Sequence, residues 1–118
     1  MAEKRPERSR EILFYTTELS KIPFLEWLDS LRDRKAVAKI KARLKRVELG
    51  NLGDWKQLEG SKVCEFRLGG RVGYRIYFGQ DGEVVVLLLG GDKDTQTRDI
   101  TKAEQYWADY EQRKSSDE

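Results

Sequence analysis

One aliphatic run, Val84-Val85-Val86-Leu87-Leu88-Leu89, constrains the fold of this 118-residue chain more than any other feature. An uninterrupted run of this length is typical of a central strand whose two faces are both covered. Two further strand-like runs precede it, at residues 63–68 and 72–78, and both alternate apolar with polar side chains. Asp81-Gly82 predicts a two-residue hairpin turn before the aliphatic run. The region therefore predicts an antiparallel meander.

Helical patterns flank this meander. Pro23 suits the first position of a helix, and Phe24, Trp27, Leu28 and Leu31 then form one apolar stripe that we expect to pack on the sheet. Asp33 is a predicted cap for a second helix, from Arg34 to about Leu49. A last helix is expected to start near Thr97, capped by Thr95 or Thr97.

Together with a first strand at residues 11–16 and a loop or short edge strand at residues 53–60, these elements follow the order β-α-α-β-β-β-(β)-α. We therefore predict one α+β domain over residues 1–118, an antiparallel sheet with the helices packed on one face. Residues 1–10 and 115–118 are expected to be mobile.

Composition excludes several classes of chemistry. The chain has no histidine and one cysteine, Cys64, so Ser–His and Cys–His pairs and an internal disulfide are ruled out. No carboxylates cluster at ligand spacing, so we expect neither a metal nor a cofactor. The N-terminus has no signal-peptide pattern, and no apolar run approaches a membrane span. We expect a cytoplasmic protein that does not bind membranes.

The net charge of +2 hides an uneven distribution. Residues 1–80 hold 18 basic and 11 acidic side chains, whereas residues 81–118 hold 5 and 10. Seven cations lie between Arg34 and Arg46 with no acid among them. They form either a solvated helix face or an electrostatic footprint for nucleic acid, and the sequence leaves both interpretations open.

Arg67 and Arg75 are predicted to share one face of adjacent strands. Two guanidinium groups in this arrangement would bind phosphate oxygens well, although Arg75 could instead pair with Glu65 across the strands. Lys93 and Gln96 lie just beyond the aliphatic strand, where a connecting loop commonly carries site residues, although Lys93 could instead pair with nearby aspartates. Such cations can stabilise a phosphoryl transition state without a metal.

Several of these segments carry a family resemblance. The stretches GYRIYF, VVVLLLGGDK and Q-x-R-D-I resemble the RelE/ParE toxin superfamily, in the addiction module killer branch close to HigB-type toxins. PFLEWLDSLRD, AKIKARLKRVELGNLGD and EFRL extend the resemblance over roughly residues 14–110. It implies the toxin of a type II toxin–antitoxin pair, a metal-independent endoribonuclease that cleaves mRNA on the ribosome and inhibits translation. Its implied partners are a helix-turn-helix antitoxin, mRNA and the ribosome, with operator DNA bound only through the antitoxin.

The resemblance also assigns roles to residues. The GYR arginine corresponds to Arg75 and the basic residue of the loop after the aliphatic strand to Lys93; with Arg67 they form the expected catalytic set. Independently of the resemblance, we expect substrate binding by Gln96, Arg71, Lys56 and Arg98. A family tyrosine has no counterpart here, because Asp99-Ile100 occupies its region. This departure leaves the general acid and base open between Asp99 and a Lys93 of lowered pKa.

Two other functions remain open at this point. The chain could be a non-enzymatic toxin of the ParE type, which shares the fold and poisons DNA gyrase. It could also be a degenerate toxin that acts only as an antitoxin-bound co-repressor.

Overall fold

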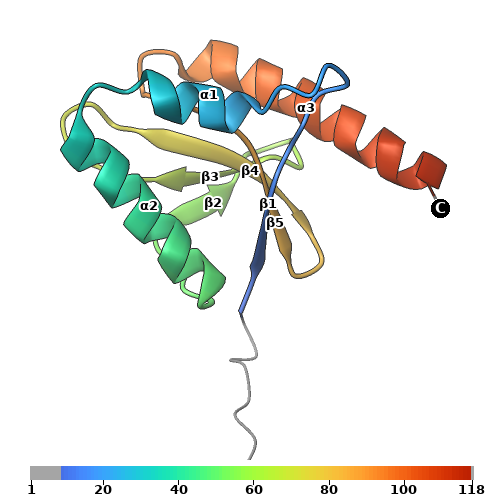
Figure 1. Cartoon of the computed structure of the whole chain (residues 1–118), viewed down its shortest axis with the longest axis horizontal. Helices are drawn as coiled ribbons and strands as arrows, with labels where there is room; N and C mark the ends of the chain where they lie inside the picture. Colours follow the sequence, from blue (N-terminus) through green and yellow to red (C-terminus); the bar gives the residue numbers. More distant parts are fainter. Residues whose placement is uncertain (1–8, 118) are drawn as a thin grey trace, which may run out of the picture.

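The computed structural model describes residues 9–117, which fold into one five-stranded sheet and three helices (Figure 1). The α+β class and the predicted order of elements are confirmed. The strands are β1 (Glu11–Phe14), β2 (Trp55–Gln57), β3 (Cys64–Arg67), β4 (Arg75–Asp81) and β5 (Val84–Gly91). The helices are α1 (Pro23–Ser30), α2 (Arg34–Glu48) and α3 (Gln96–Asp117).

The sheet is mixed rather than antiparallel. Its strand order is β1-β5-β4-β3-β2, and β1 pairs with β5 in parallel while the other neighbouring strands are antiparallel. Strand β1 leads through α1 and α2 to β2 at the far edge of the sheet, and three antiparallel steps then bring β5 beside β1 in parallel. The meander of β3, β4 and β5 is confirmed, and β2 forms the edge expected of residues 53–60.

Helices cover both faces of the sheet, which corrects the expectation of one covered face. Helices α1 and α2 supply Phe24 and Ile40 to a core that includes Phe66 and Phe78. Helix α3 supplies Ala103 and Trp107 to a second core. Strand β5 serves both, because Val85 and Leu87 point to the first core while Val86 and Leu88 point to the second. The prediction of an aliphatic strand covered on both sides is therefore confirmed.

Two glycines let the helices approach the sheet closely. A Cβ atom on Gly90 would lie 2.1 Å from the ring of Trp27 in α1. A Cβ atom on Gly79 would lie 2.2 Å from the ring of Trp107 in α3. Each tryptophan thus lies flat against strand backbone, and the expected packing of Trp27 on the sheet is confirmed.

Local signals set most element ends. Pro23 starts α1, and the Asp33 carboxylate accepts hydrogen bonds from the backbone N–H groups of Lys35 and Ala36, as a capping residue does. The hairpin turn differs by one residue from the prediction. Asp81 still pairs with Val84, so the turn residues are Gly82 and Glu83, with Gly82 at φ +60°. A glycine at the first turn position suits a type II′ turn.

Both chain ends differ in part from the expectation of mobility. Residues 1–8 and residue 118 lie outside the described part of the chain. The Arg10 backbone N–H donates to Glu48, and the Arg10 side chain pairs with Glu83. Helix α3 continues through Asp117.

The Asp109 carboxylate links the second half of α3 to Tyr15, the residue that follows β1. The Tyr15 hydroxyl donates to Asp109 at 2.6 Å, and Arg113 pairs with the same carboxylate at 2.7 Å. The hydrogen bond from Tyr15 and the neighbouring Arg113 hold the pKa of Asp109 below its ordinary value. Burial, followed by Asp109, raises the pKa of Tyr15 to about 12.

The contacts of Asp109 with Tyr15 and Arg113 predict that the protein loses stability in acid. A carboxyl group whose pKa is lowered by folding stabilises the fold above its unfolded pKa of 3.8, and that contribution disappears as pH falls through the folded value. We expect Asp109→Asn to lower the thermal midpoint at pH 7 and to reduce its decline below about pH 4. Circular dichroism melts at a series of pH values measure both effects. Asp29→Asn, at an exposed position of α1, is the matched control, and equal pH profiles for wild type and Asp109→Asn would contradict the assignment.

Candidate functional site

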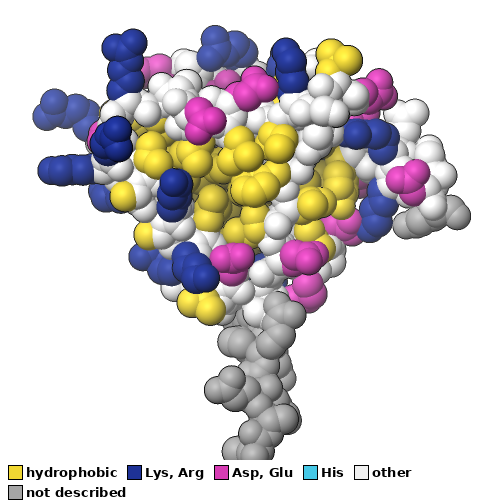
Figure 2. Space-filling model, viewed as in Figure 1, with side chains coloured by type: hydrophobic (Ala, Val, Ile, Leu, Met, Phe, Trp, Pro, Cys, Tyr) yellow, Lys and Arg dark blue, Asp and Glu magenta, His cyan; other side chains and the backbone are white. Residues whose placement is uncertain are grey.

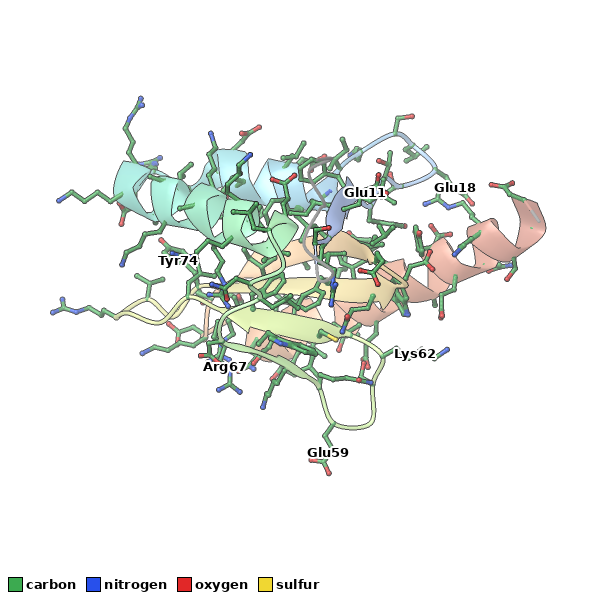
Figure 3. The ribbon with its side chains drawn as sticks, turned by 90° about the horizontal axis from the view of Figure 1, so that it is seen from below. Glu11, Glu18, Glu59, Lys62, Arg67 and Tyr74 are labelled. Atoms are coloured by element: carbon green, nitrogen blue, oxygen red, sulfur yellow. The ribbon has the colours of Figure 1, made fainter. Side chains whose placement is uncertain are left out.

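The two predicted arginines lie side by side on the sheet. Arg67 of β3 is directly opposite Arg75 of β4, and Gly91 of β5 continues the same row. Their neighbours Phe66 and Ile76 point into the core under α1 and α2, so both arginines occupy the other face. Figure 3 shows Arg67 on the side of the sheet away from these helices. Helix α3 contacts β5 and β4, and the Arg67 side chain remains 37% exposed.

A buried carboxylate holds the pair together. Glu65 is 0% exposed, and its Oε2 accepts hydrogen bonds from Arg67 Nε at 2.8 Å and from Arg75 Nη1 at 3.1 Å. The bond to Glu65 raises the pKa of Arg67. The pairing of Arg75 with Glu65, one of the alternatives left open by the sequence, is thus present. Glu65 offsets one of the two cations, and the carboxylate of Asp54 also acts on Arg67.

The Nη atoms that Glu65 does not bind can face a ligand, whereas Arg75 Nε is buried and has no hydrogen-bond partner among the described residues. Arg67 is held through Nε, so this bond does not use its Nη1 and Nη2 atoms. Arg75 is held through Nη1 and is 20% exposed. We call Glu65, Arg67 and Arg75 the arginine site. Two fixed guanidinium groups on one open surface can bind adjacent oxygens of a phosphate or phosphodiester group.

The loop after β5 brings two further predicted residues to this end of the sheet. Gln96, the first residue of α3, donates its side-chain amide to Glu65 Oε1 at 3.4 Å. It therefore supports the arginine site from the helix side. Lys93 is exposed, and its aliphatic stem lies against Gly73, where an added Cβ would come within 3.2 Å. Lys93 thus lies beside the loop that leads into β4.

Asp99, the candidate acid or base, is only 5% exposed. The Thr95 hydroxyl donates to its Oδ2 atom, Arg98 approaches Oδ1 at 3.7 Å, and a Cβ on Gly91 would lie 1.9 Å from Oδ2. These contacts give the carboxylate a role in joining the start of α3 to the end of β5. The placement does not favour Asp99 as a base that reaches a substrate.

The other predicted substrate-binding residues scatter around the site. Lys56 pairs in register with Glu65, so it lies on the arginine face, and it is exposed. Arg71 belongs to the loop between β3 and β4 and lines a separate groove beside Lys35 and Lys39 of α2. Arg98 is exposed on the first turn of α3. Lys56 is therefore the member of this group that extends the arginine site.

Tyr77 carries no sequence signal of a site, because it reads as an ordinary strand residue. Its side chain is 0% exposed, and its hydroxyl has no hydrogen-bond partner among the described residues. Burial, and then the charges of Glu65 and Asp99, raise its pKa. The phenol therefore stays protonated beneath the site, as a neutral group near two carboxylates.

The basic run of α2 divides into two kinds of residue. Arg43 is 6% exposed, and its guanidinium donates to the backbone carbonyls of Leu52, Asp54 and Arg67 at 2.7–3.1 Å while lying over the ring of Phe66. Arg43 is thus a buried structural residue and is not part of an electrostatic footprint. The other six cations of the run are exposed. Burial lowers the pKa of Arg43.

No group of three potential metal-ligating side chains occurs among residues 9–117. Within the same residues, no helix is long and apolar enough to cross a membrane. This surface presents cationic and amide side chains, which are groups that can bind an anionic ligand.

The fold is an α+β domain in which two arginines lie side by side on one face of the sheet, bound by a buried glutamate. A comparison with known proteins adds one relationship. The chain is 45% identical over 83 residues to an uncharacterized protein of Haemophilus influenzae. The aligned region covers 70% of this chain and 83% of that protein. The chain belongs to the same family as this protein. No family model and no solved structure matches the chain significantly.

Proposed function

We propose that this protein is the toxin of a type II toxin–antitoxin system and acts as an endoribonuclease on ribosome-bound mRNA in the cytoplasm. The observation that carries the proposal is the pair of arginines fixed by a buried glutamate on an open face. The family resemblance supports the proposal as well, because the segments GYRIYF and EFRL, which contain Arg75 and Arg67, are among those that carry it. The proposed partner of the protein is a helix-turn-helix antitoxin. The toxin–antitoxin pair binds operator DNA through this antitoxin.

The proposed chemistry uses the 2′-hydroxyl of the RNA as the nucleophile. This oxygen releases its proton to solvent water as it attacks the adjacent phosphorus, a 2′,3′-cyclic phosphate forms, and the bond to the 5′-oxygen breaks. Arg67 and Arg75 stabilise the negative charge that accumulates on the phosphoryl oxygens. Lys56 guides the RNA backbone, and Gln96 supports the site through Glu65. Lys93 lies in the adjacent loop, where its ammonium group can offer a proton to the leaving oxygen.

Primer extension on mRNA after induction of the protein in cells tests the proposal. We expect new 5′ ends within translated reading frames, appearing within minutes of induction and absent when ribosomes are kept off the message. Intact mRNA together with inhibited gyrase supercoiling would replace this proposal by a ParE-type mechanism. Intact mRNA with undisturbed supercoiling would instead favour a degenerate toxin that acts only as an antitoxin-bound co-repressor.

Two substitutions separate the remaining candidates for proton transfer. We expect Lys93→Ala to slow mRNA cleavage about 100-fold, which is the lower end of the effect of a general acid–base group. Asp99→Asn should leave the cleavage rate within a few-fold of wild type and instead lower the thermal midpoint, because this carboxylate is buried and bonded to Thr95. Single-turnover cleavage assays and melting curves on the same preparations measure both effects. A loss of cleavage in Asp99→Asn without a loss of stability would reverse the two assignments.

A further inference from the structure

Two buried donors in and beside the arginine site have no hydrogen-bond partner among residues 9–117, namely Arg75 Nε and the Tyr77 hydroxyl. Both side chains project from the same face of β4, because residues two apart on a strand share a face. Ile76 lies between them and points to the other face, where hydrophobic side chains gather between α1 and α2 (Figure 2). Buried donors without a partner destabilise a fold and are rare, so two in one site indicate a second arrangement that uses them.

Arg75 is held less tightly than Arg67. Both arginines donate to Glu65 Oε2, Arg67 at 2.8 Å and Arg75 at 3.1 Å. One bond of this length restrains a guanidinium group less than a bidentate pair does, whereas a phosphate group would offer Arg75 two acceptor oxygens. An anionic ligand on the open face of the sheet can therefore draw Arg75 away from Glu65.

The departure of Arg75 would remove a donor from a buried charge. Glu65 is 0% exposed, and a buried charge that loses a partner is strongly destabilising. Arg67 would remain bound to Oε2, and the Gln96 amide bonds to Oε1 at the long distance of 3.4 Å. A further donor near Glu65 would therefore stabilise the arrangement in which Arg75 binds a ligand.

Tyr77 is placed to be that donor. It lies directly opposite Glu65 in the register of β3 and β4, and the Cβ atoms of such a pair are about 4.5–5.5 Å apart. Burial, and then the charge of Glu65, raise the pKa of Tyr77, so the phenol keeps its proton and lies within the electrostatic reach of the carboxylate. A hydrogen bond from a hydroxyl group to a carboxylate is among the stronger ones in proteins.

We propose that Tyr77 is a positioning residue of the arginine site, whose hydroxyl donates to Glu65 when Arg75 turns away to bind an anionic ligand. The exchange gives the Tyr77 hydroxyl a partner, exposes Arg75 to the ligand and keeps Glu65 bonded. The inference rests on the proposed function in one respect, since an RNA phosphate is the ligand expected to draw Arg75. The exchange of donors can be tested without RNA.

A double-mutant cycle tests the exchange by thermal unfolding. Arg75→Met removes the donors of Arg75 and keeps most of its volume, and Tyr77→Phe removes the hydroxyl alone. In the wild-type background, Tyr77→Phe should leave the thermal midpoint unchanged or raise it, because the hydroxyl has no partner there. In the Arg75→Met background it should lower the midpoint by about 4 °C or more, because the hydroxyl now serves Glu65.

Tyr106→Phe is the matched control for the cycle. Tyr106 is a partly buried tyrosine of α3 that stacks on Tyr15, away from Glu65. Its substitution should change the midpoint equally in both backgrounds. An equal change for Tyr77→Phe in both backgrounds would overturn the proposal.

NMR of protein labelled at the Cζ carbon of tyrosine gives a signature that a packing role would not produce. The Tyr77 signal, assigned by its loss in Tyr77→Phe, should move toward the phenolate position in Arg75→Met, because donation to a carboxylate weakens the O–H bond. Inorganic phosphate added to the wild type should move it in the same direction, and this measurement needs no substitution at Arg75. A Tyr77 signal that stays in place on addition of phosphate, whether or not the Arg75 amide shifts, would overturn the proposal.

The proposed nuclease function and this exchange can fail separately. If the cycle and the Tyr77 signal behave as expected while mRNA stays intact in cells, the exchange of donors stands and the nuclease function fails. If mRNA is cleaved while Tyr77→Phe has equal effects in both backgrounds, the nuclease function stands and Tyr77 is an ordinary core residue.

Discussion

Replacing Arg75 by alanine is expected to reduce mRNA cleavage about 100- to 1,000-fold and to abolish toxicity, because removal of one group aimed at transition-state charge typically has an effect of this size. The substitution should leave the fold intact, since Arg75 lies on an open face and is 20% exposed. It leaves Glu65 with one of its two arginines, so a modest decrease in thermal midpoint is expected. Cleavage kinetics on ribosome-bound mRNA, together with a melting curve, measure the two effects.

Arg46→Ala is the matched control for this experiment. Arg46 is an exposed arginine of α2, on the helix that packs against the opposite face of the sheet. It should lower cleavage by less than about twofold, as surface substitutions away from a site generally do. Glu65→Gln adds information, because it keeps both arginines but removes the charge that fixes them. A full rate in Arg75→Ala would refute the arginine site as the centre of cleavage.

The largest expected effect on stability belongs to Arg43. Replacement by methionine keeps much of the packing over Phe66 but removes the donors to the carbonyls of Leu52, Asp54 and Arg67. The carbonyls of Leu52 and Arg67 lose this donor, whereas the Asp54 carbonyl still accepts from the Arg67 backbone N–H. An acceptor left without a partner costs about 1–3 kcal/mol, and partial access of water reduces the sum. We expect a loss of about 3 kcal/mol or more in the free energy of unfolding, which lowers the thermal midpoint by roughly 10 °C.

Arg43 also connects the fold to the candidate site. Its Nη1 donates to the carbonyl of Arg67, so it fixes the backbone of β3 from the helix side at 2.9 Å. Chemical denaturation of Arg43→Met and of its control Arg46→Met compares a buried arginine with an exposed one on the same helix. Equal unfolding free energies for the two variants would show that the carbonyl contacts contribute nothing to stability.

Local patterns in the sequence were sufficient for most of the secondary structure. The aliphatic run, Pro23 and Asp33 each predict an element or its start through interactions within a few residues, such as side-chain periodicity or a cap. The alternation in residues 63–68 and 72–78 also placed Arg67 and Arg75 on one face, because side chains on neighbouring strands follow the same two-residue period. The candidate arginine pair was therefore predictable from strand periodicity alone.

Tertiary structure decided what the pattern could not contain. The parallel pairing of β1 and the position of α3 depend on where a crossover returns, and both faces of β5 are apolar, so the sequence did not say which helix covers which face. Arg43 is buried because it binds carbonyls that lie 9 to 24 residues away in the sequence. A cationic side chain on a helix would normally be predicted to face solvent. Glu65 binds both arginines only because strand register and α3 enclose it together. Local periodicity specifies elements, whereas contacts between distant segments determine which charged side chains become buried and which remain available to a ligand.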